Sequence, residues 1–288
     1  EFYGDVNVMK AGIAFSSKIN TVSPRYAEEI QTPEGGCGLD GFLRTRSADV
    51  SGILNGIDYS EWNPWRDPLI EARFSRNRLT GKARCKSALQ QTLNLPVKNV
   101  PLFCCVSRLV YEKGIDLLIE SLDALLLEDL QIVVLGSGDP ELERRLAETS
   151  QRNPERLKVV LRYDEELAHQ FYAGCDYFLM PSRSEPCGLS QMYSLAYGTL
   201  PVVHRTGGLA NTVQDATPQN IEAGEATGIV FCHPSAQALQ EAVRRALSLY
   251  SNPTVLERLR KAGMTENFSW ERSSRAYQAL YREAMAKP

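Results

Sequence analysis

The sequence has no run of basic residues, since its 32 Lys and Arg residues are scattered and the net charge is only −3. Nucleic acids and anionic membranes bind clustered positive charge, so neither is an expected partner. Long apolar runs are missing too. The stretches 115–127 and 132–135 fall short of the roughly 18 to 20 residues of a membrane span. No membrane-spanning segment is therefore predicted.

Signals of cysteine pairing are also absent. The seven cysteines are an odd number and none forms a Cys-x-x-Cys pair. Cys104 and Cys105 are adjacent inside an apolar run, where free cysteines behave as small core residues. This usage indicates a reducing compartment.

What is present is the composition of an ordinary globular protein, with 43% hydrophobic and 23% charged residues. A length of 288 residues favours one full domain plus a substantial piece of another. The chain begins at Glu1, without a methionine and inside what looks like a domain. We therefore expect an incomplete assembly.

Short apolar runs alternate with amphipathic stretches from about Lys82 onward, the pattern of a parallel sheet covered on both faces. The predicted strands are 102–106, 132–135, 157–161, 177–180, 200–203 and 229–231. The predicted helices are 114–127, 140–151, 165–173, 189–197 and 236–250. The expected fold class is α/β with a doubly wound, Rossmann-like sheet, whose ligands gather at the carboxyl ends of the strands.

Residues 1–60 follow another pattern, with strand-like pieces at 20–23 and 52–54 and a glycine-rich stretch at 34–41 that reads as a mobile loop. We interpret 1–60 as the remnant of a preceding domain with its hinge, and 61–268 as the sheet domain. Residues 58–68, rich in Trp and Pro, are a candidate stiff linker. Residues 269–288 form a separate C-terminal helix with an apolar stripe.

The first candidate site follows the strand 102–106, where Arg108 and Lys113 precede a predicted helix. The Arg108 guanidinium can grip phosphate oxygens with its two-pronged donor set, and Lys113 adds a point charge. Helix N-termini favour the same anions. The alternative is a solvated basic pair in a loop.

The second candidate site follows the strand 177–180, in the sequence Pro-Ser-Arg-Ser-Glu-Pro-Cys-Gly-Leu. Pro186 restricts Glu185 to extended backbone, and Gly188 permits a close approach of the backbone to a ligand. Glu185 is therefore a candidate for binding sugar hydroxyls, while amides near Leu189 and Ser190 receive phosphate. The alternative is an exposed loop acid.

A third candidate is Arg-Thr-Gly-Gly-Leu at 205–209, where paired glycines permit a turn with inward-pointing amides. A fourth feature, Gly-Ser-Gly-Asp-Pro at 136–140, has half of a dinucleotide-binding fingerprint but no third glycine. We interpret it as an ordinary turn, because Pro140 suits the first position of a helix.

Together, these motifs resemble the C-terminal signature of the starch and glycogen synthase family. The matching segments are SRLVYEKG at 107–114, EPCGL at 185–189 and RTGGL at 205–209, joined by FYGDVNVMKAGI at 2–13, TVSPRYAEEI at 21–30, SGILNGID at 51–58 and NFSW at 267–270. The resemblance thus covers essentially the entire chain.

The resemblance implies a retaining glucosyltransferase of GT-B architecture that adds glucose to the non-reducing end of an α-1,4-glucan. ADP-glucose is the implied donor and an α-glucan the implied acceptor, while the family's missing N-terminal domain is the implied partner. No cofactor or metal is expected. The sequence has no Asp-x-Asp motif, so Arg108 and Lys113 are expected to replace a metal at the diphosphate.

By the same resemblance, Arg108, Lys113 and Glu185 form the catalytic set. The residues implied to bind substrate are Asn55, Tyr163, Cys187, Gly188, Leu189, Ser190, Thr206, Gly207 and Gly208. Tyr163 corresponds to the residue beside adenine, and Asn55 is a donor contact from the hinge side. The implied location is the plastid stroma for a plant or algal protein and the cytoplasm for a bacterial one.

The chain departs from the family pattern at two places. Ser184 replaces a Phe before Glu185, and the family's Lys-Thr-Gly-Gly-Leu element and cleft histidine do not occur. None of His169, His204 and His233 is assigned that role, because lone histidines are more often structural or solvated. One alternative is therefore a donor-binding module without catalysis.

Other activities fit the sequence less well. A related sucrose-type synthase is expected to carry a second Glu eight residues after the first, where this chain has Tyr193. A phosphorylase needs a pyridoxal-phosphate lysine in a glycine-rich context, and we find no such lysine in this sequence. A dehydrogenase needs Gly-x-Gly-x-x-Gly after the first strand, where this chain has Ser-Arg-Leu.

Overall fold

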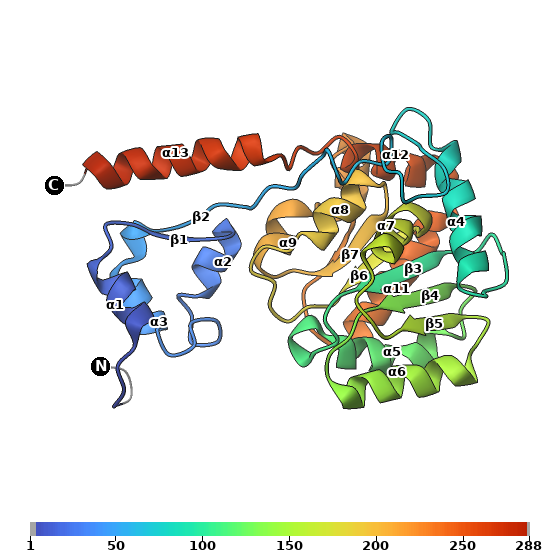
Figure 1. Ribbon diagram of the computed structural model, residues 1–288, viewed down its shortest axis with the longest axis horizontal. Coiled ribbons are helices and arrows are strands. Elements are labelled where there is room, and N and C mark those ends of the chain that lie inside the picture. Colours follow the sequence, from blue (N-terminus) through green and yellow to red (C-terminus); the bar gives the residue numbers. More distant parts are fainter. Residues whose placement is uncertain (1–3, 287–288) are drawn as a thin grey trace.

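The computed structural model describes residues 4–286, and its centre is a six-stranded parallel sheet in the order β5-β4-β3-β6-β7-β8 (Figure 1). Three strands have the predicted bounds, and the other three differ by one residue at one end. The strands are β3 (Leu102–Val106), β4 (Gln131–Leu135), β5 (Leu157–Val160), β6 (Tyr177–Met180), β7 (Leu200–His204) and β8 (Ile229–Phe231). The predicted doubly wound sheet is therefore confirmed.

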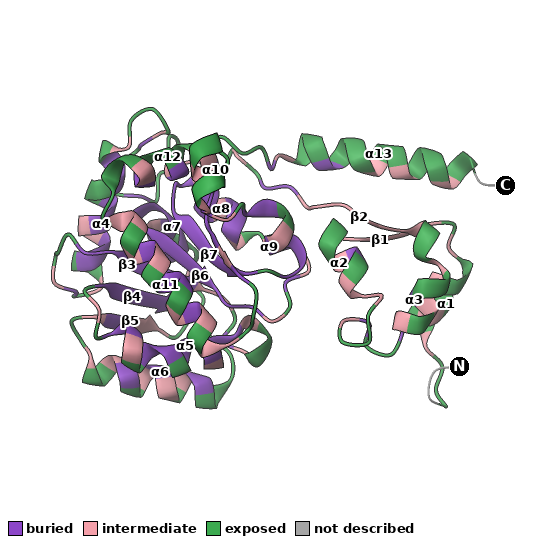
Figure 2. Cartoon of the chain, turned by 180° about the vertical axis from the view of Figure 1, so that it is seen from behind, coloured by how far each residue is buried: buried purple, intermediate pink, exposed green. Residues whose placement is uncertain are grey.

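Each strand sends alternate side chains to opposite faces of the sheet. Phe103 and Cys105 of β3 pack into one hydrophobic core, and Leu102 and Cys104 pack into another. Both sides of the strands are buried (Figure 2), which explains their continuous apolar runs. The first core is closed by α5 (Ile115–Leu125), α6 (Pro140–Arg152), α11 (Ala236–Tyr250) and α12 (Pro253–Gly263), and the second by α4 (Thr80–Thr92) and α7 (Glu165–Gly174).

A side-chain cap fixes where α6 begins. Asp139 accepts hydrogen bonds from the amides of Glu141 and Leu142 at the start of α6, with Pro140 in the first helical position as predicted. The shorter helices are α8 (Ser190–Ala196), α9 (Gly207–Thr212) and α10 (Pro218–Ala223). The sequence did not predict α9 and α10, since six residues are less than two helical turns and leave little periodicity.

The strand order creates a crevice between β3 and β6. From β3 the chain moves outward to β4 and β5, and it then returns to the other side of β3 to build β6, β7 and β8. The loops that leave the carboxyl ends of β3 and β6 consequently diverge to opposite faces. Ligands of open α/β sheets bind at such a switch point.

Residues 4–60 form a separate group of small elements beside the sheet (Figure 1). Strands β1 (Ile19–Thr21) and β2 (Val50–Gly52) pair in parallel, one or two residues from their predicted positions. The helices here were not predicted: α1 (Val8–Phe15), α2 (Pro24–Glu29) and α3 (Asp40–Thr45). The predicted loop 34–41 is mostly turn, but it ends where α3 begins at Asp40.

The C-terminal helix α13 (Trp270–Ala286) runs back along this first group (Figure 1). Tyr277 accepts a hydrogen bond from Asn20 at 3.3 Å, and Lys18 pairs with Glu283 at 3.1 Å. Ser273 is the one buried residue among those that the structure describes in α13 (Figure 2). Helix α13 thus returns toward the first region with a largely exposed surface. No helix within residues 4–286 has the length and apolarity to cross a bilayer.

Candidate functional site

Two adjoining cavities open at the switch point. The smaller, of about 220 Å³, lies between the loops after β3 and β6 and is lined by Lys113, Glu185 and residues 188–190. The larger, of about 500 Å³, extends over the loops after β4 and β5 and is lined by Trp62, Tyr163 and Tyr193 among others. Residues 106–108 line both cavities, so one extended ligand can occupy the two together.

Lys113 and Glu185 form an ion pair in the smaller cavity. The Lys113 Nζ donates to both Glu185 carboxylate oxygens at 2.7 Å, and the Ser182 hydroxyl donates to Glu185 at 3.0 Å. The Glu185 side chain is 8% exposed and that of Lys113 is 21% exposed. A buried carboxylate is costly unless it is paired, so Glu185 holds a lysine ammonium against the cavity.

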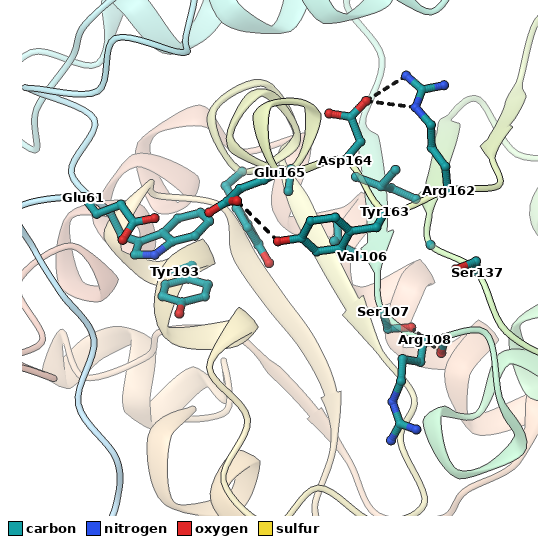
Figure 3. Close-up of a pocket in the computed structure, with 15 residues that line it drawn as sticks. Glu61, Val106, Ser107, Arg108, Ser137, Arg162, Tyr163, Asp164, Glu165 and Tyr193 are labelled. Atoms are coloured by element: carbon teal, nitrogen blue, oxygen red, sulfur yellow. Dashed lines mark hydrogen bonds and ion pairs between the residues drawn. The ribbon is translucent and has the colours of Figure 1, made fainter.

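Arg108 lies at the junction of the two cavities. Its side chain is exposed, and within residues 4–286 its guanidinium has no hydrogen bond or ion pair. Figure 3 shows it extending away from Tyr163. Arg108 is therefore a free cation with five donors, next to the partly neutralised Lys113.

Arg183 is also basic but has a different role in this loop. Both of its terminal nitrogens donate to Asp116 at 2.7 Å, and its guanidinium lies 3.6 Å from the centre of the Tyr111 ring. The Asp116 hydrogen bonds raise the pKa of Arg183. Arg183 thus ties the loop after β6 to the loop after β3, which sets the spacing between Glu185 and Lys113.

The larger cavity has aromatic walls. Trp62 stacks between His169 and Tyr193, with ring centroids 3.9 Å apart on each side. Tyr163 is 82% exposed and donates a hydrogen bond to Glu165 at 3.3 Å (Figure 3), and Glu165 raises its pKa, so the phenol stays neutral. Flat apolar walls with a few polar groups suit a planar heterocycle such as a nucleobase.

A buried network fixes Trp62 from behind. Asp67 accepts hydrogen bonds from His169 at 2.7 Å and from Tyr197. Burial favours the neutral acid, but the hydrogen bonds from His169 and Tyr197 lower the pKa of Asp67. His169 is therefore a structural residue, as expected. His204 is also buried, with one ring nitrogen 2.8 Å from the Ser182 carbonyl.

One group of side chains has metal-ligand character. Ligand atoms of Glu61, Glu165 and His169 lie within 4.8 Å of one another. This group borders the aromatic cavity, where Glu61 and Glu165 are lining residues, and it lies apart from the residues that line the smaller cavity. The group therefore belongs to the aromatic cavity and not to the cavity that contains Lys113.

The remaining predicted residues fall into two sets. Gly188, Leu189 and Ser190 line the smaller cavity, with Gly188 in left-handed backbone at φ 69° and α8 beginning at Ser190 without a side-chain cap. The other set lines neither cavity, and its substrate contacts stay predictions: Asn55, Cys187, Thr206, Gly207 and Gly208. Burial raises the pKa of Cys187, although a hydrogen bond from the Asn55 backbone opposes this.

Sequence reasoning missed most of the aromatic cavity, including Glu61, Trp62, Glu165 and Tyr193. In the sequence, Trp62 belongs to a predicted linker, and Tyr193 stands where a sucrose-type synthase is expected to carry a second Glu. The stack brings together segments more than 100 residues apart. No spacing within one segment reports such a contact, so the aromatic residues in polar surroundings were the one available signal.

Comparison with known families gives two matches. Residues 90–264 match the family described as glycosyl transferases group 1. This range contains the loops after β3 and β6, which line the smaller cavity. Residues 1–45 match the family described as starch synthase catalytic domain. The chain therefore combines a match over most of the sheet region with a match over the small elements that precede it.

The chain is similar to longer bacterial proteins named glycogen synthase. It is 52% identical to glycogen synthase 1 of Methylococcus capsulatus over 99% of this chain and 58% of that protein. It is 50% identical to a glycogen synthase of Thioalkalivibrio sulfidiphilus, over 99% of this chain and 60% of that protein. The chain thus spans about three fifths of the length of these relatives.

Solved structures support the fold. The catalytic domain of starch synthase IV from Arabidopsis thaliana, bound to ADP and acarbose, is 37% identical, with a TM-score of 0.91 over 98% of this chain and 58% of that one. A sucrose-phosphate synthase from Thermosynechococcus elongatus is 22% identical, with a TM-score of 0.65 over 98% of this chain and 61% of that one, and shows the shared fold alone. The predicted GT-B-type α/β fold is confirmed.

Proposed function

Because the chain belongs to the group 1 glycosyl transferases, we propose that it is the donor-binding part of a retaining glucan synthase. Its reaction is the transfer of glucose from ADP-glucose to the non-reducing end of an α-1,4-glucan. The main support is the meeting of Arg108, Lys113 and Glu185 at two adjoining cavities. Relatives named glycogen synthase support the class of reaction.

The electrostatics of the smaller cavity fit the leaving group of this reaction. Negative charge builds on the diphosphate as the bond to glucose breaks, and fixed cations stabilise that charge. Arg108 has no competing partner among the described residues, and Lys113 is held at 2.7 Å by Glu185. We propose that Arg108, Lys113 and the amides at Leu189 and Ser190 bind the diphosphate without a metal ion.

Glu185 has two tasks in this proposal. In the free chain it holds Lys113 in the cavity. With donor bound, Lys113 turns its charge toward the diphosphate, and the Glu185 carboxylate accepts hydrogen bonds from glucose hydroxyls. The Ser182 hydroxyl donates to Glu185 at 3.0 Å and keeps the carboxylate oriented.

The aromatic cavity is proposed to hold the base of the donor. Tyr163 contacts the base from the open side, and the stack of Trp62 and Tyr193 forms the opposite wall. The preference for ADP is supported by the similar starch synthase, which was solved with ADP. We propose that five further residues contribute to donor binding from behind the Glu185 loop: Asn55, Cys187, Thr206, Gly207 and Gly208.

The glucan and the rest of the first domain are proposed to approach from the other side. Val8, Met9 and Phe15 of α1 are between 65% and 91% exposed, which is unusual for large apolar residues on one short helix. The chain spans 58% of one relative, and residues 1–45 match the starch synthase domain. We propose that the remainder of that domain covers α1 and presents the acceptor.

Calorimetric titration with ADP and UDP tests the donor site. Replacing Arg108 with Ala removes a charged two-pronged contact, so ADP affinity is expected to fall about 10- to 100-fold. Arg66→Ala, an exposed arginine outside both cavities, is the matched control and should bind as the wild type does. Equal ADP affinity in wild type and Arg108→Ala would exclude this diphosphate site.

A second candidate function is a donor-binding module without transfer, and the described cavities favour it in one respect. Both contain groups suited to a nucleotide diphosphate, and neither extends onto α1 or α13. Incubation with radiolabelled ADP-glucose, glycogen and a small sugar acceptor separates these functions. Label in glycogen supports the synthase, binding without label supports the module, and label on a small sugar acceptor supports a sucrose-type enzyme.

A further inference from the structure

Helix α2 of the first region docks directly behind the Glu185 loop. Ser23 caps α2 by accepting from the Tyr26 amide, and its buried hydroxyl donates to the Pro186 carbonyl at 2.5 Å. On the same helix, the Arg25 amide donates to Asn211 of α9 at 2.9 Å. These residues are more than 160 positions apart in sequence, so α2 connects the first region to the candidate site.

Glu29, the last residue of α2, supplies the cap that α9 lacks. Thr206 is the N-cap residue of α9, but its own side chain caps no amide of that helix. Instead, the Glu29 carboxylate accepts from the Gly207 amide at 3.0 and 3.1 Å and from the Thr206 hydroxyl at 3.2 and 3.3 Å. A carboxylate at a helix N-terminus stabilises its unpaired amides.

The capped amide lies one residue from a contact to Glu185. The Gly208 amide donates to the Glu185 carbonyl at 2.9 Å. Gly207 has φ 43°, and a Cβ placed there would collide with the Glu185 carbonyl, while one at Gly208 would collide with that of Cys187. The two backbones are therefore pressed together, and movement at Gly207 displaces Glu185.

We propose that Glu29 is a positioning residue for the donor site, acting through Gly207 and Gly208 to hold the backbone of Glu185 when α2 docks. The inference rests on the proposed donor site, because the Glu185 loop lines the smaller cavity. It also assigns a task to the glycines at 207 and 208, which line neither cavity. The absence of a side chain at Gly207 and Gly208 leaves room for the carbonyls of Glu185 and Cys187. The Gly207 amide contacts Glu29 of α2, and the Gly208 amide contacts the Glu185 carbonyl.

This arrangement couples docking of the first region to donor binding. If Glu29 orders the loop that contacts the donor, then the donor strengthens docking of α2 by the same factor, since coupling between two binding events is reciprocal. Bound ADP should therefore slow amide exchange in residues 24–29, although none of them lines either cavity.

The test compares Glu29→Gln with wild type by hydrogen exchange and by ADP calorimetry, both well below the unfolding midpoint. The amide variant keeps the length of the side chain but loses its charge, so exchange at Gly207 and Gly208 is expected to rise about tenfold. ADP affinity should fall about 3- to 10-fold. ADP should slow exchange in residues 24–29 in wild type and have little effect there in Glu29→Gln.

Glu28→Gln is the matched control, because it removes an equal charge from the same helix and its carboxylate pairs with Arg25 at the surface. Equal losses in both variants would reduce the effect to net charge and overturn the role of Glu29. The role of Glu29 would also be overturned if Glu29→Gln lowered the unfolding midpoint but left ADP affinity and amide exchange at residues 207–208 as in wild type. A wild-type chain that bound no ADP would instead contradict the donor site, and exchange at 207–208 would still test the cap.

Discussion

The sheet region and the first region differ in how far they bury their apolar side chains. In β3, β4 and β6 almost every residue is buried, with helices on both faces. Helix α1 has no buried residue, and Ser273 is the only one in the described part of α13. The sheet region thus contains its own core, whereas the first region and α13 present surfaces that fit the covering domain proposed above.

The two regions contribute different parts of the candidate site: the sheet region contains the cavities, and the first region contributes docking contacts. Both cavities lie on the sheet region, so the groups proposed to contact the donor are positioned by the buried core of that region. The docking contacts of Ser23 and Glu29 come from the region that lacks such a core. The proposed donor site is therefore contacted on one side by an element from outside the core of the sheet region, and we expect that element to open locally at a lower free energy than the core.

The largest contrast is expected between two phenylalanines. Phe103 is fully buried in β3, and Phe103→Ala should lower the free energy of unfolding by about 3–5 kcal/mol through lost burial and the resulting cavity. Phe15 is 91% exposed, and Phe15→Ala should leave the midpoint of urea unfolding nearly unchanged. Similar shifts for both variants would show that α1 is packed in solution and break the comparison.

A buried ion cluster gives the next effect. Asp176 pairs with Lys86 at 2.6 Å and with Arg260 at 2.5 Å. Asp176→Asn leaves two cations without their partner, so it should cost about 3–5 kcal/mol at pH 7. Urea unfolding measures this cost, with Asp123→Asn on the exposed side of α5 as the control.

The same cluster predicts the direction of its pH dependence. Burial opposes ionisation of Asp176, but Lys86 and Arg260 lower its pKa below that of the unfolded chain. The ionised Asp176 therefore stabilises the fold fully above an unfolded pKa of about 3.9, and this contribution is lost as the pH falls through the lower folded pKa. The difference between wild type and Asp176→Asn should shrink below about pH 4. A constant difference down to pH 2 would contradict the ion-pair explanation.

The smallest expected effect is a difference in amide exchange rate between two helices of the unmodified chain. Amides of α11, whose apolar face is buried in the core, should exchange slowly. Amides of α13 should exchange quickly, since its stripe of Tyr277 and Tyr281 has little cover. Hydrogen exchange with mass spectrometry distinguishes the two, and equal protection would mean that α13 has a packed partner in solution.

The sequence predicted the sheet well, because strands buried on both faces leave continuous apolar runs bounded by Gly, Ser or Pro. It also placed Arg108, Lys113 and Glu185 at strand ends, where a parallel sheet gathers them. It did not predict the stack of Trp62 with Tyr193 or the cap that Glu29 gives α9. Both depend on residues more than 100 positions apart, and local periodicity carries no information on such pairs. The helices α1 to α3 were missed since they are short and largely exposed.

The most direct test of the donor site is ADP binding by wild type and Lys113→Ala, measured by calorimetry at constant ionic strength. Lys113 is the cation that Glu185 holds against the smaller cavity, so its removal should weaken ADP binding at least tenfold. Lys98→Ala, which removes an exposed lysine far from β3's carboxyl end, should not change the affinity. Equal affinity of wild type and Lys113→Ala for ADP would contradict the proposed diphosphate site at Lys113.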